Sequence, residues 1–450
     1  MHLPDRPPFA LRARILTPLA DGGVADFPDG VIVVGADGRI DAVGNADDWV
    51  ARLSAMQLDP IDLRPFVLLP GMVDLHAHLP QLPNAGLGAG LDLLTWLDRY
   101  IFPLERRFDD AEGAASLAPA AFRAFAAAGT TTLLAYGAVY KASMDGAFQA
   151  AEEHGIRAIL GKVMMDRGTY DTTIDPATIL DRSVRESAEL IERWHGADEG
   201  RLGYAVTPRF AISCTAEMLR ESAALAARTG AWWQTHVSED PGEIREVARL
   251  FPEAIDYVDV YDRAGGLGAK TILAHAVHLT DRELARLVET DTRVAHCPAS
   301  NLFLASGIMP LSRFREAGLK IGLGSDVAGG PDPSLFTVMQ IGAYAQAALR
   351  TVVGETRPVR GPLDWLRAGT LDGAAALGID DHVGSLEAGK EADLIAVDPR
   401  MTAARRDLPY EAGRVAPEEV MSRLIFRAHP DMVRGAWVRG RRLEGPAAAD

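Results

Sequence analysis

The chain has 450 residues, of which 48% are apolar and 24% charged, and its formal net charge is −16 at pH 7. This length exceeds one ordinary domain unless an α/β barrel with additions makes up most of it, and the composition is that of a globular enzyme. A chain this acidic repels phosphate backbones and anionic lipid, which disfavours nucleic acid and membrane surfaces as partners.

Short strand patterns occur near both ends of the chain. Within residues 1–66, VIVVGADGRIDAVG predicts two strands joined by a turn at Asp37 and Gly38, which is the signal of a β-hairpin. Residues 381–450 contain EADLIAVDP and VRGAWVRGRRL, two further strand patterns interrupted by Gly and Asp. We therefore expect residues 1–66 and 381–450 to form one small β-sandwich domain assembled from both termini.

Between these ends, residues 67–380 alternate short apolar runs with amphipathic helical segments such as ESAELIERW and DRELARLVE. This alternation predicts parallel β/α units, and eight strand candidates suit a TIM-like (β/α)8 catalytic barrel. The predicted strands in chain order are FVLLPGMVDLHAH, TTTLLAYG, AILGKVM, GYAVTPRF, AWWQTHVSE, TILAHAVHL, TRVAHCP and KIGLGSD.

Cysteine usage and the apolar segments indicate a cytoplasmic protein. The two cysteines, Cys214 and Cys297, are too few for a disulfide framework. The N-terminal MHLPDRPPFALRAR lacks the apolar core and the cleavage site of a secretory leader. The most apolar long stretch, residues 114–138, is broken by Arg123 and by GTTT, so it predicts a buried helix followed by a buried strand rather than a membrane span.

The segment VDLHAH, which ends the first predicted barrel strand, carries two histidines separated by one residue. Side chains at positions i and i+2 of a strand point to the same face, so His76 and His78 converge if this segment is a strand end. Barrel active sites lie at the C-terminal ends of the strands. Two neutral imidazoles there would supply half of a transition-metal site, whereas packing or surface exposure is the alternative interpretation.

Three later strands also end in histidine or aspartate. His236 ends AWWQTH, TILAHAVH contains His275 and His278, and KIGLGSD ends with Asp326. Either His275 or His278 could lie at its strand end, and the residues alone leave this choice open. Three histidines and one carboxylate suit Zn²⁺ or Fe²⁺ with one position left for water, so the sequence predicts a catalytic metal site.

Glu239 follows His236 by three residues and therefore lies on the loop just beyond a predicted ligand. Metal coordination lowers the pKa of bound water towards about 7, and Glu239 is placed to shuttle a proton between that water and a substrate. A solvated loop carboxylate is the alternative, since SEDPGE is acidic and turn-like. For His296, which follows a different strand, packing or substrate contact is favoured over ligation.

The signatures of several other enzyme classes are missing from the sequence. Base deaminases of the H-x-E type need paired cysteines, and this chain has no C-x-x-C. It also has no P-loop, no G-x-G-x-x-G opening a helix and no G-x-S-x-G elbow. Nucleotide hydrolysis, hydride transfer and serine-hydrolase chemistry are therefore disfavoured.

The motifs PGMVDLHAH, HVSE, AH and GSD, in this order on a barrel, resemble the amidohydrolase superfamily and its mononuclear metal-dependent deaminase branch. The resemblance implies one metal ion per chain, Zn²⁺ with Fe²⁺ as the alternative, and a homodimer. A binuclear member would need a bridging carboxylated lysine, for which Lys162 is the candidate. The implied catalytic residues are Glu239, His275 and Asp326, and the implied metal ligands are His76, His78, His236 and Asp326.

Further segments resemble guanine deaminases within this superfamily, namely HLPQ, LLTWLDRYIFPLERRF, GKVMMDR, TPRF and AHCPASNLFLASG. This resemblance implies hydrolytic deamination of guanine to xanthine and ammonia. An arginine and a glutamine can hydrogen-bond the edge of guanine, and aromatic side chains can cover its face. The implied substrate-binding residues are Gln81, Trp96, Arg209 and Phe210.

Two departures from the family pattern bear on the substrate. Tyr140 occupies a position where the family usually has histidine, and the loop at residues 83–92 is rich in glycine. The first alternative is therefore a deaminase of a related amino-heterocycle, such as 8-oxoguanine, a pterin or a triazine, with the same mechanism. A remote alternative is a barrel that has lost catalysis and serves as a scaffold, although all the predicted metal ligands are present.

Overall fold

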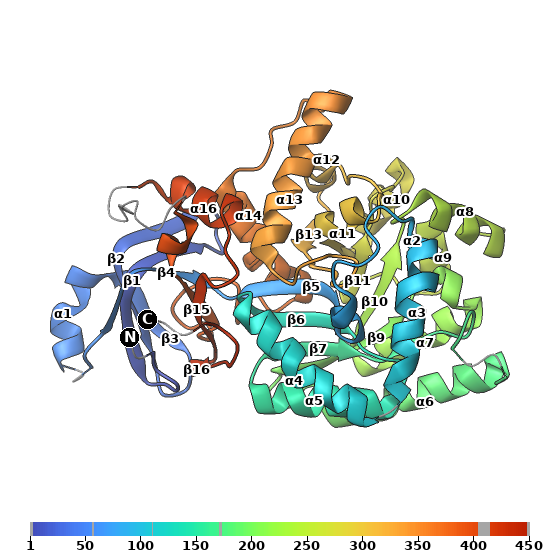
Figure 1. The fold of residues 1–450 in the computed structure, drawn as a ribbon, viewed down its shortest axis with the longest axis horizontal. Coiled ribbons are helices and arrows are strands. Elements are labelled where there is room, and N and C mark those ends of the chain that lie inside the picture. Colours follow the sequence, from blue (N-terminus) through green and yellow to red (C-terminus); the bar gives the residue numbers. More distant parts are fainter. Residues whose placement is uncertain (1–2, 56–57, 110, 171–172, 404–414, 448–450) are drawn as a thin grey trace.

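The computed structural model describes residues 3–55, 58–109, 111–170, 173–403 and 415–447. A curled β-sheet lies at one end of the molecule, and a ring of strands surrounded by helices makes up the rest (Figure 1). Within the described residues no helix combines the length and the apolar character needed to cross a membrane. Cys214 and Cys297 are both buried and unpaired.

Strands from both ends of the chain pair in one seven-stranded sheet. The predicted hairpin is confirmed, because β2 and β3 pair antiparallel, whereas β1 and β4 run parallel. The sheet curls so that the rings of Phe9 and Trp437 lie 6.3 Å apart across a shared apolar core. In spatial order its strands are β16 (Arg441–Arg442), β15 (Val433–Val438), β14 (Leu394–Val397), β4 (Ile61–Pro70), β1 (Phe9–Pro18), β2 (Val24–Val34) and β3 (Ile40–Asn45).

The barrel has eight parallel strands in sequential order, with short β8 (Val163–Met164) as an extra strand paired to β9. Hydrogen bonds from Asp326 N to His76 O (2.7 Å) and from His78 N to Val327 O (2.9 Å) join the segment after β13 to β5. The predicted TIM-like fold is thus confirmed. Its strands are β5 (Met72–His78), β6 (Thr130–Tyr136), β7 (Arg157–Gly161), β9 (Leu202–Pro208), β10 (Trp232–Val237), β11 (Thr271–His275), β12 (Arg293–His296) and β13 (Lys320–Leu323).

The first predicted barrel strand is in fact two strands, so the prediction of one strand over FVLLPGMVDLHAH was wrong. The apolar run FVLL belongs to β4, which pairs with the seven-stranded sheet and ends at Pro70, and β5 begins at Met72. Between them, Gly71 passes so close to β6 that a Cβ atom there would lie 1.9 Å from Thr131 Oγ1. Glycine lets the chain cross between the two sheets at this contact.

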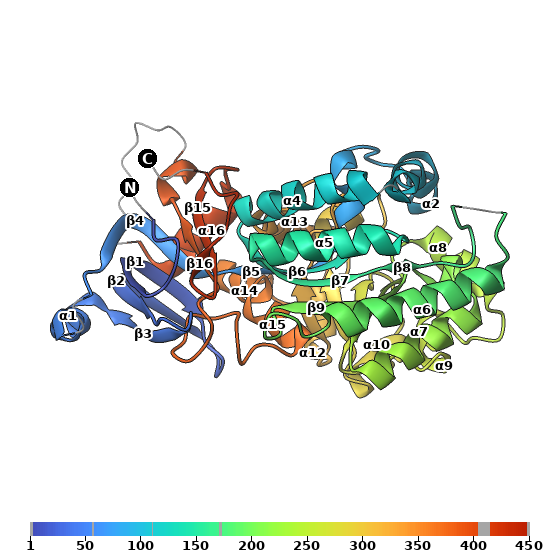
Figure 2. The same ribbon diagram turned by 90° about the horizontal axis from the view of Figure 1, so that it is seen from below.

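Helices cover the outside of the barrel, and α4, α5 and α6 run along β6, β7 and β9 (Figure 2). The predicted helix and strand within residues 114–138 correspond to α4 and β6. The helices are α1 (Ala46–Ala55), α2 (Leu93–Trp96), α3 (Phe102–Glu105), α4 (Ala111–Ala127), α5 (Lys141–His154), α6 (Pro176–Trp194), α7 (Ala216–Thr229), α8 (Pro241–Leu250), α9 (Tyr257–Arg263), α10 (Asp281–Glu289), α11 (Pro298–Phe303), α12 (Leu311–Glu316), α13 (Leu335–Ala348), α14 (Pro362–Ala368), α15 (Leu371–Leu377) and α16 (Pro417–Phe426).

Candidate active site

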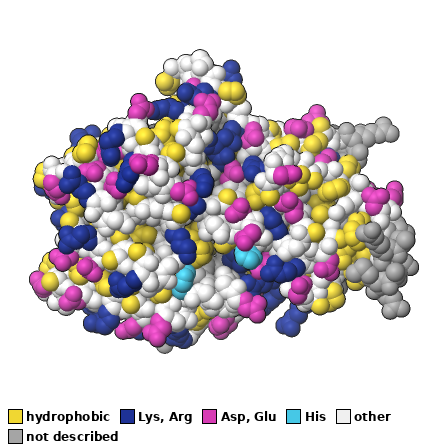
Figure 3. Space-filling model, turned by 180° about the vertical axis from the view of Figure 1, so that it is seen from behind, with side chains coloured by type: hydrophobic (Ala, Val, Ile, Leu, Met, Phe, Trp, Pro, Cys, Tyr) yellow, Lys and Arg dark blue, Asp and Glu magenta, His cyan; other side chains and the backbone are white. Residues whose placement is uncertain are grey.

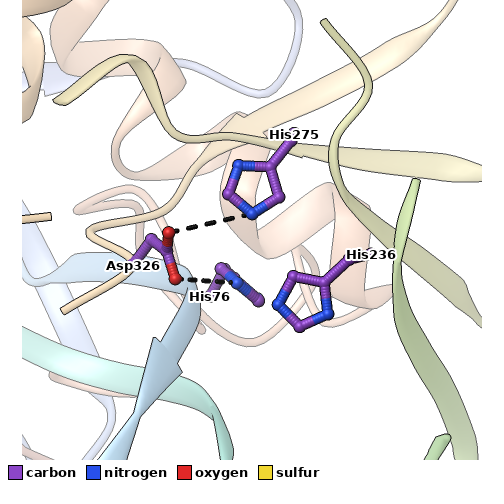
Figure 4. Close-up of side chains that lie close together, drawn as sticks. All are labelled: His76, His236, His275 and Asp326. Carbon is purple, nitrogen blue, oxygen red and sulfur yellow. Dashed lines mark ion pairs between the residues drawn. The ribbon is translucent and has the colours of Figure 1, made fainter. Parts of the chain in front are cut away.

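Histidines from three strands and the aspartate after β13 meet at the C-terminal end of the barrel (Figure 4). One ligand atom from each of His76, His236, His275 and Asp326 lies within 4.8 Å of every other. The fifth group is His78, whose Nε2 lies 3.3 Å from Asp326 Oδ1 and 3.3 Å from His236 Nε2. The structure therefore brings all four predicted ligands together, with His275 beside them.

The donor set fits a small divalent cation. His76 Nε2 lies 3.0 Å from Asp326 Oδ1, close to the separation of about 3.3 Å expected between ligands of a tetrahedral ion with bonds near 2.05 Å. Burial lowers the pKa of His78 to about 4 and that of His236 well below its ordinary value. These imidazoles are therefore neutral at pH 7, which is the form that binds metals. The residues present fit a metal ion.

Hydrogen bonds at the far side of two rings direct their Nε2 atoms inward. His236 Nδ1 lies 2.6 Å from the Arg209 carbonyl oxygen, and His275 Nδ1 lies 2.9 Å from Asn301 Oδ1. A proton on Nδ1 leaves the Nε2 lone pair facing the cluster. Asn301 belongs to the AHCPASNLFLASG segment, and no local sequence pattern indicates that it contacts His275, which lies 26 residues earlier.

The backbone at two of these strand ends is left-handed. His275 has φ 71° and Asp326 has φ 50°, values that residues with a side chain rarely adopt. Such conformations cost of order 1–3 kcal/mol each and concentrate at functional sites. This geometry turns the two side chains from the strand direction into the cluster. His278 is the other histidine that the sequence leaves as a candidate for this strand end. Its Nε2 instead lies 2.7 Å from the Ser306 carbonyl oxygen.

Glu239 is buried beside the cluster, so the solvated-loop interpretation does not hold. Its Oε2 lies 3.4 Å from His275 Nε2, and Ser306 Oγ donates to its Oε1 at 3.4 Å. Burial, followed by the charges of Asp326 and Glu243, raises the pKa of Glu239 well above its ordinary value. Its backbone N–H donates to Glu243 Oε2 at 2.9 Å, which holds the loop in place. A raised pKa favours the protonated form of the carboxyl group and suits a group that exchanges a proton with water or substrate.

A pocket of about 370 Å³ opens directly onto this cluster. Leu93, Leu97 and Leu304 supply apolar walls, while His78, His236, Glu239, His275 and Asp326 form the end that carries the chemistry. All four predicted substrate-binding residues line this pocket, namely Gln81, Trp96, Arg209 and Phe210.

Comparison with known families agrees with this geometry. The model of the amidohydrolase family matches residues 67–443, a span that contains the whole cluster and the pocket.

The chain belongs to the amidohydrolase family.

Its similarities to individual proteins cover nearly the full length. A probable guanine deaminase of Deinococcus radiodurans is 37% identical over 445 residues, which is 98% of this chain and 96% of that protein. The structure of Escherichia coli guanine deaminase matches with a TM-score of 0.88 and 31% identity, over 97% of this chain and 99% of the other. A guanine deaminase from C. acetobutylicum with guanine bound in its active site matches with a TM-score of 0.87 and 26% identity, over the same shares.

In this amidohydrolase, Glu105 at the end of α3 organises the pocket wall, a role that the sequence analysis missed. Glu105 Oε2 accepts from Arg209 Nη1 at 2.5 Å, and its Oε1 accepts from Gln81 Nε2 at 2.7 Å. The only sequence signal was the position of Glu105 in the W-L-x-x-Y-x-F-P-x-E segment. Its partners lie 24 and 104 residues away, so no local pattern could identify them.

Three residues singled out from the sequence are not among those that line this pocket. Lys162 is buried outside the barrel lumen, where its Nζ lies 3.3 Å from Glu186 Oε2 on α6. It does not approach the ligands, and the bridging-lysine alternative was therefore wrong. Tyr140 lines a separate cavity together with Lys162 and is not among the residues that line the pocket. His296 is buried at the end of β12 and is also not among the lining residues.

The glycine-rich loop at residues 83–92 supports the indole of Trp96. Trp96 Nε1 donates to the Leu87 carbonyl oxygen at 2.9 Å. Gly88 has φ 92°, and a Cβ atom there would lie 2.6 Å from Trp96 Cδ1. Glycine at this position therefore allows both the turn and the close approach to the ring.

Proposed function

We propose that this amidohydrolase deaminates guanine hydrolytically to xanthine and ammonia. The observation that carries the proposal is a single pocket that joins Gln81 and Arg209 at one wall to Glu239 and the ligand cluster at the other. The similarity to guanine deaminases over nearly the whole chain supports the same substrate. A related amino-heterocycle remains the alternative, because it would undergo the same chemistry.

We further propose that His76, His78, His236 and Asp326 hold one Zn²⁺ per chain, with Fe²⁺ as the alternative. Support comes from the contacts of His275, which faces Oδ2 of Asp326 at 3.7 Å, whereas His76 and His78 both face Oδ1. His275 also approaches Glu239, whose Oε2 lies 3.4 Å from His275 Nε2. When bound, such an ion lowers the pKa of a coordinated water so that hydroxide is available near neutral pH.

The roles of the surrounding residues follow from their places in the pocket. Glu239 takes a proton from water and delivers it to a ring nitrogen of guanine. His275 and Asp326 hold the incoming oxygen and take up its second proton. The new C–O bond forms at C2, the second proton passes on to the exocyclic amine, and the C2–N bond then breaks so that the nitrogen leaves as ammonia. Trp96 and Phe210 cover the flat faces of the ring.

Incubation of the purified, zinc-loaded protein with guanine is expected to yield xanthine and ammonia in equal amounts. Xanthine is followed by ultraviolet absorbance and ammonia by a coupled assay, while metal content is measured by mass spectrometry. A protein that holds metal but leaves guanine unchanged would contradict the proposed substrate, and 8-oxoguanine, pterins and triazines would then be tested in the same assay. A protein that neither holds nor takes up metal would favour the scaffold alternative.

We propose that the chain forms a homodimer in the cytoplasm. The surface mixes acidic and basic side chains, and a projecting arm carries apolar ones (Figures 1 and 3). This arm continues α13 into a π-helical turn at Leu349–Val353, where Val352 and Val353 are 82% and 72% exposed.

Light scattering is expected to give twice the chain mass of 48.3 kDa, and Val353→Asp is expected to shift the population towards the monomer. A wild-type protein that is monomeric at micromolar concentration would contradict the proposal.

A further inference from the structure

Glu105 is a buried carboxylate behind the pocket wall, only 3% exposed, and it accepts hydrogen bonds from Gln81, Arg209 and Tyr170. Its Oε1 accepts from Gln81 Nε2 at 2.7 Å and from Arg209 Nη2 at 3.4 Å. Its Oε2 accepts from Arg209 Nη1 at 2.5 Å and also from the Tyr170 hydroxyl. Glu105 does not line the pocket itself, but two of its three partners do.

The charge state of Glu105 determines how the Gln81 amide is turned. Burial alone would raise the pKa of Glu105, but the charge of Arg209 and the hydrogen bonds from Arg209 and Tyr170 outweigh burial and lower it. An ionised carboxylate only accepts hydrogen bonds, so Gln81 must direct its NH₂ group towards Glu105. The Gln81 carbonyl oxygen then faces the other way. It is buried and has no hydrogen-bond partner among the described residues.

Glu105 also fixes the Arg209 guanidinium, because Gln81 Nε2 and Arg209 Nη2 both donate to its Oε1. Two of its nitrogens bind Glu105, and its central carbon lies 5.1 Å from the centre of the Phe102 ring. Because a guanidinium has five N–H groups, Arg209 can still donate into the pocket that it lines. The wall therefore presents one acceptor, Gln81 Oε1, beside one donor from Arg209.

This acceptor–donor pair matches one edge of a 6-oxopurine. In guanine the N1–H donor lies next to the C6 carbonyl acceptor, so both groups find a partner on the wall. In 2-aminopurine the same edge has a bare N1 lone pair and a C–H, and in 2,6-diaminopurine it has a lone pair and an amine. Either analogue would bring N1 against the Gln81 carbonyl and leave buried polar groups unpaired, which is costly.

We propose that Glu105 is a positioning residue that sets the substrate class of the pocket. By holding the Gln81 carbonyl inward beside Arg209, it selects purines with the N1–H and C6 carbonyl edge and rejects those with an unprotonated N1. Guanine and both analogues carry the same 2-amino group, so the selection acts on the edge and not on the reacting carbon. This inference rests on the proposed guanine deamination.

The test compares kcat/KM for guanine and for 2-aminopurine in wild-type and Glu105→Gln protein. In the wild type, kcat/KM is expected to be about 10⁴-fold higher for guanine than for 2-aminopurine. A site that hydrogen-bonds polar groups of its substrate rejects analogues that lack those groups by such factors. In Glu105→Gln a neutral amide can donate or accept, so Gln81 is free to turn. The kcat/KM for guanine is then expected to fall about 100-fold, mainly through a higher KM. The kcat/KM for 2-aminopurine is expected to change less, so the ratio of the two kcat/KM values should fall at least about 10-fold. Where 2-aminopurine turnover is undetectable, its inhibition constant against guanine replaces kcat/KM.

Glu186→Gln is the matched control, because Glu186 pairs with buried Lys162 outside the pocket, and it should leave the preference unchanged. If Glu105→Gln does not fold, as judged by its melting curve, Tyr170→Phe removes one donor to Glu105 without changing the pocket lining. In Tyr170→Phe the ratio of kcat/KM for guanine to kcat/KM for 2-aminopurine is expected to fall several-fold. An unchanged preference in a folded variant overturns the inference alone, whereas a wild type inactive on guanine overturns the proposed function as well.

Discussion

Glu239→Gln is expected to lower kcat for guanine by about 10³-fold or more while the protein keeps its full metal content. Glutamine preserves the size of the side chain but cannot take up and release the proton. Glu239 contacts His275 and Ser306 and is not one of the proposed ligands, so the ion should stay bound. Steady-state kinetics and metal analysis by mass spectrometry on the same sample measure both quantities.

Glu253→Gln serves as the control for this substitution, because Glu253 is exposed beyond α8 and is not among the residues that line the pocket. It should retain wild-type kcat and metal. Full activity in Glu239→Gln would exclude the proton-shuttle role. Loss of metal in that variant would instead place Glu239 among the ligands.

His78→Asn and His275→Asn are expected to separate metal binding from catalysis. His78 Nε2 lies 3.3 Å from both Asp326 Oδ1 and His236 Nε2, as expected for a ligand. Its loss should weaken metal affinity by more than the roughly 10- to 100-fold that loss of an outer partner costs. His275→Asn should keep the ion and lose about 10²- to 10⁴-fold in kcat, because it removes only a group that handles the proton.

Metal affinity is measured by competition with a chromophoric chelator, which does not depend on activity. His382→Asn is the control, since His382 is on the surface, with its side chain 49% exposed. The reverse result, in which His275→Asn loses the ion and His78→Asn keeps it, would make His76, His236, His275 and Asp326 the ligand set. One ligand atom from each of those four lies within 4.8 Å of every other, so the experiment decides between two real alternatives.

Patterns that depend on near neighbours in the chain could be predicted from the sequence. The alternation of apolar runs and amphipathic segments predicted the eight barrel strands, because strands and helices bury side chains with different periods. The spacing of His76 and His78 predicted that they converge, because alternate residues of a strand share a face. The end of each strand predicted where the chemistry lies, because parallel strands in a barrel end on one side.

Only the tertiary structure decided the features that depend on contacts between distant segments. The division of FVLLPGMVDLHAH between two sheets follows from the close approach of Gly71 to Thr131. The choice of His275 over His278 follows from a left-handed backbone turn and from Asn301, 26 residues further on. Glu105 gains its role from partners up to 104 residues away. Sequence periodicity reports only which face a residue occupies within its own element, so which elements meet, and at which atoms, was determined by packing.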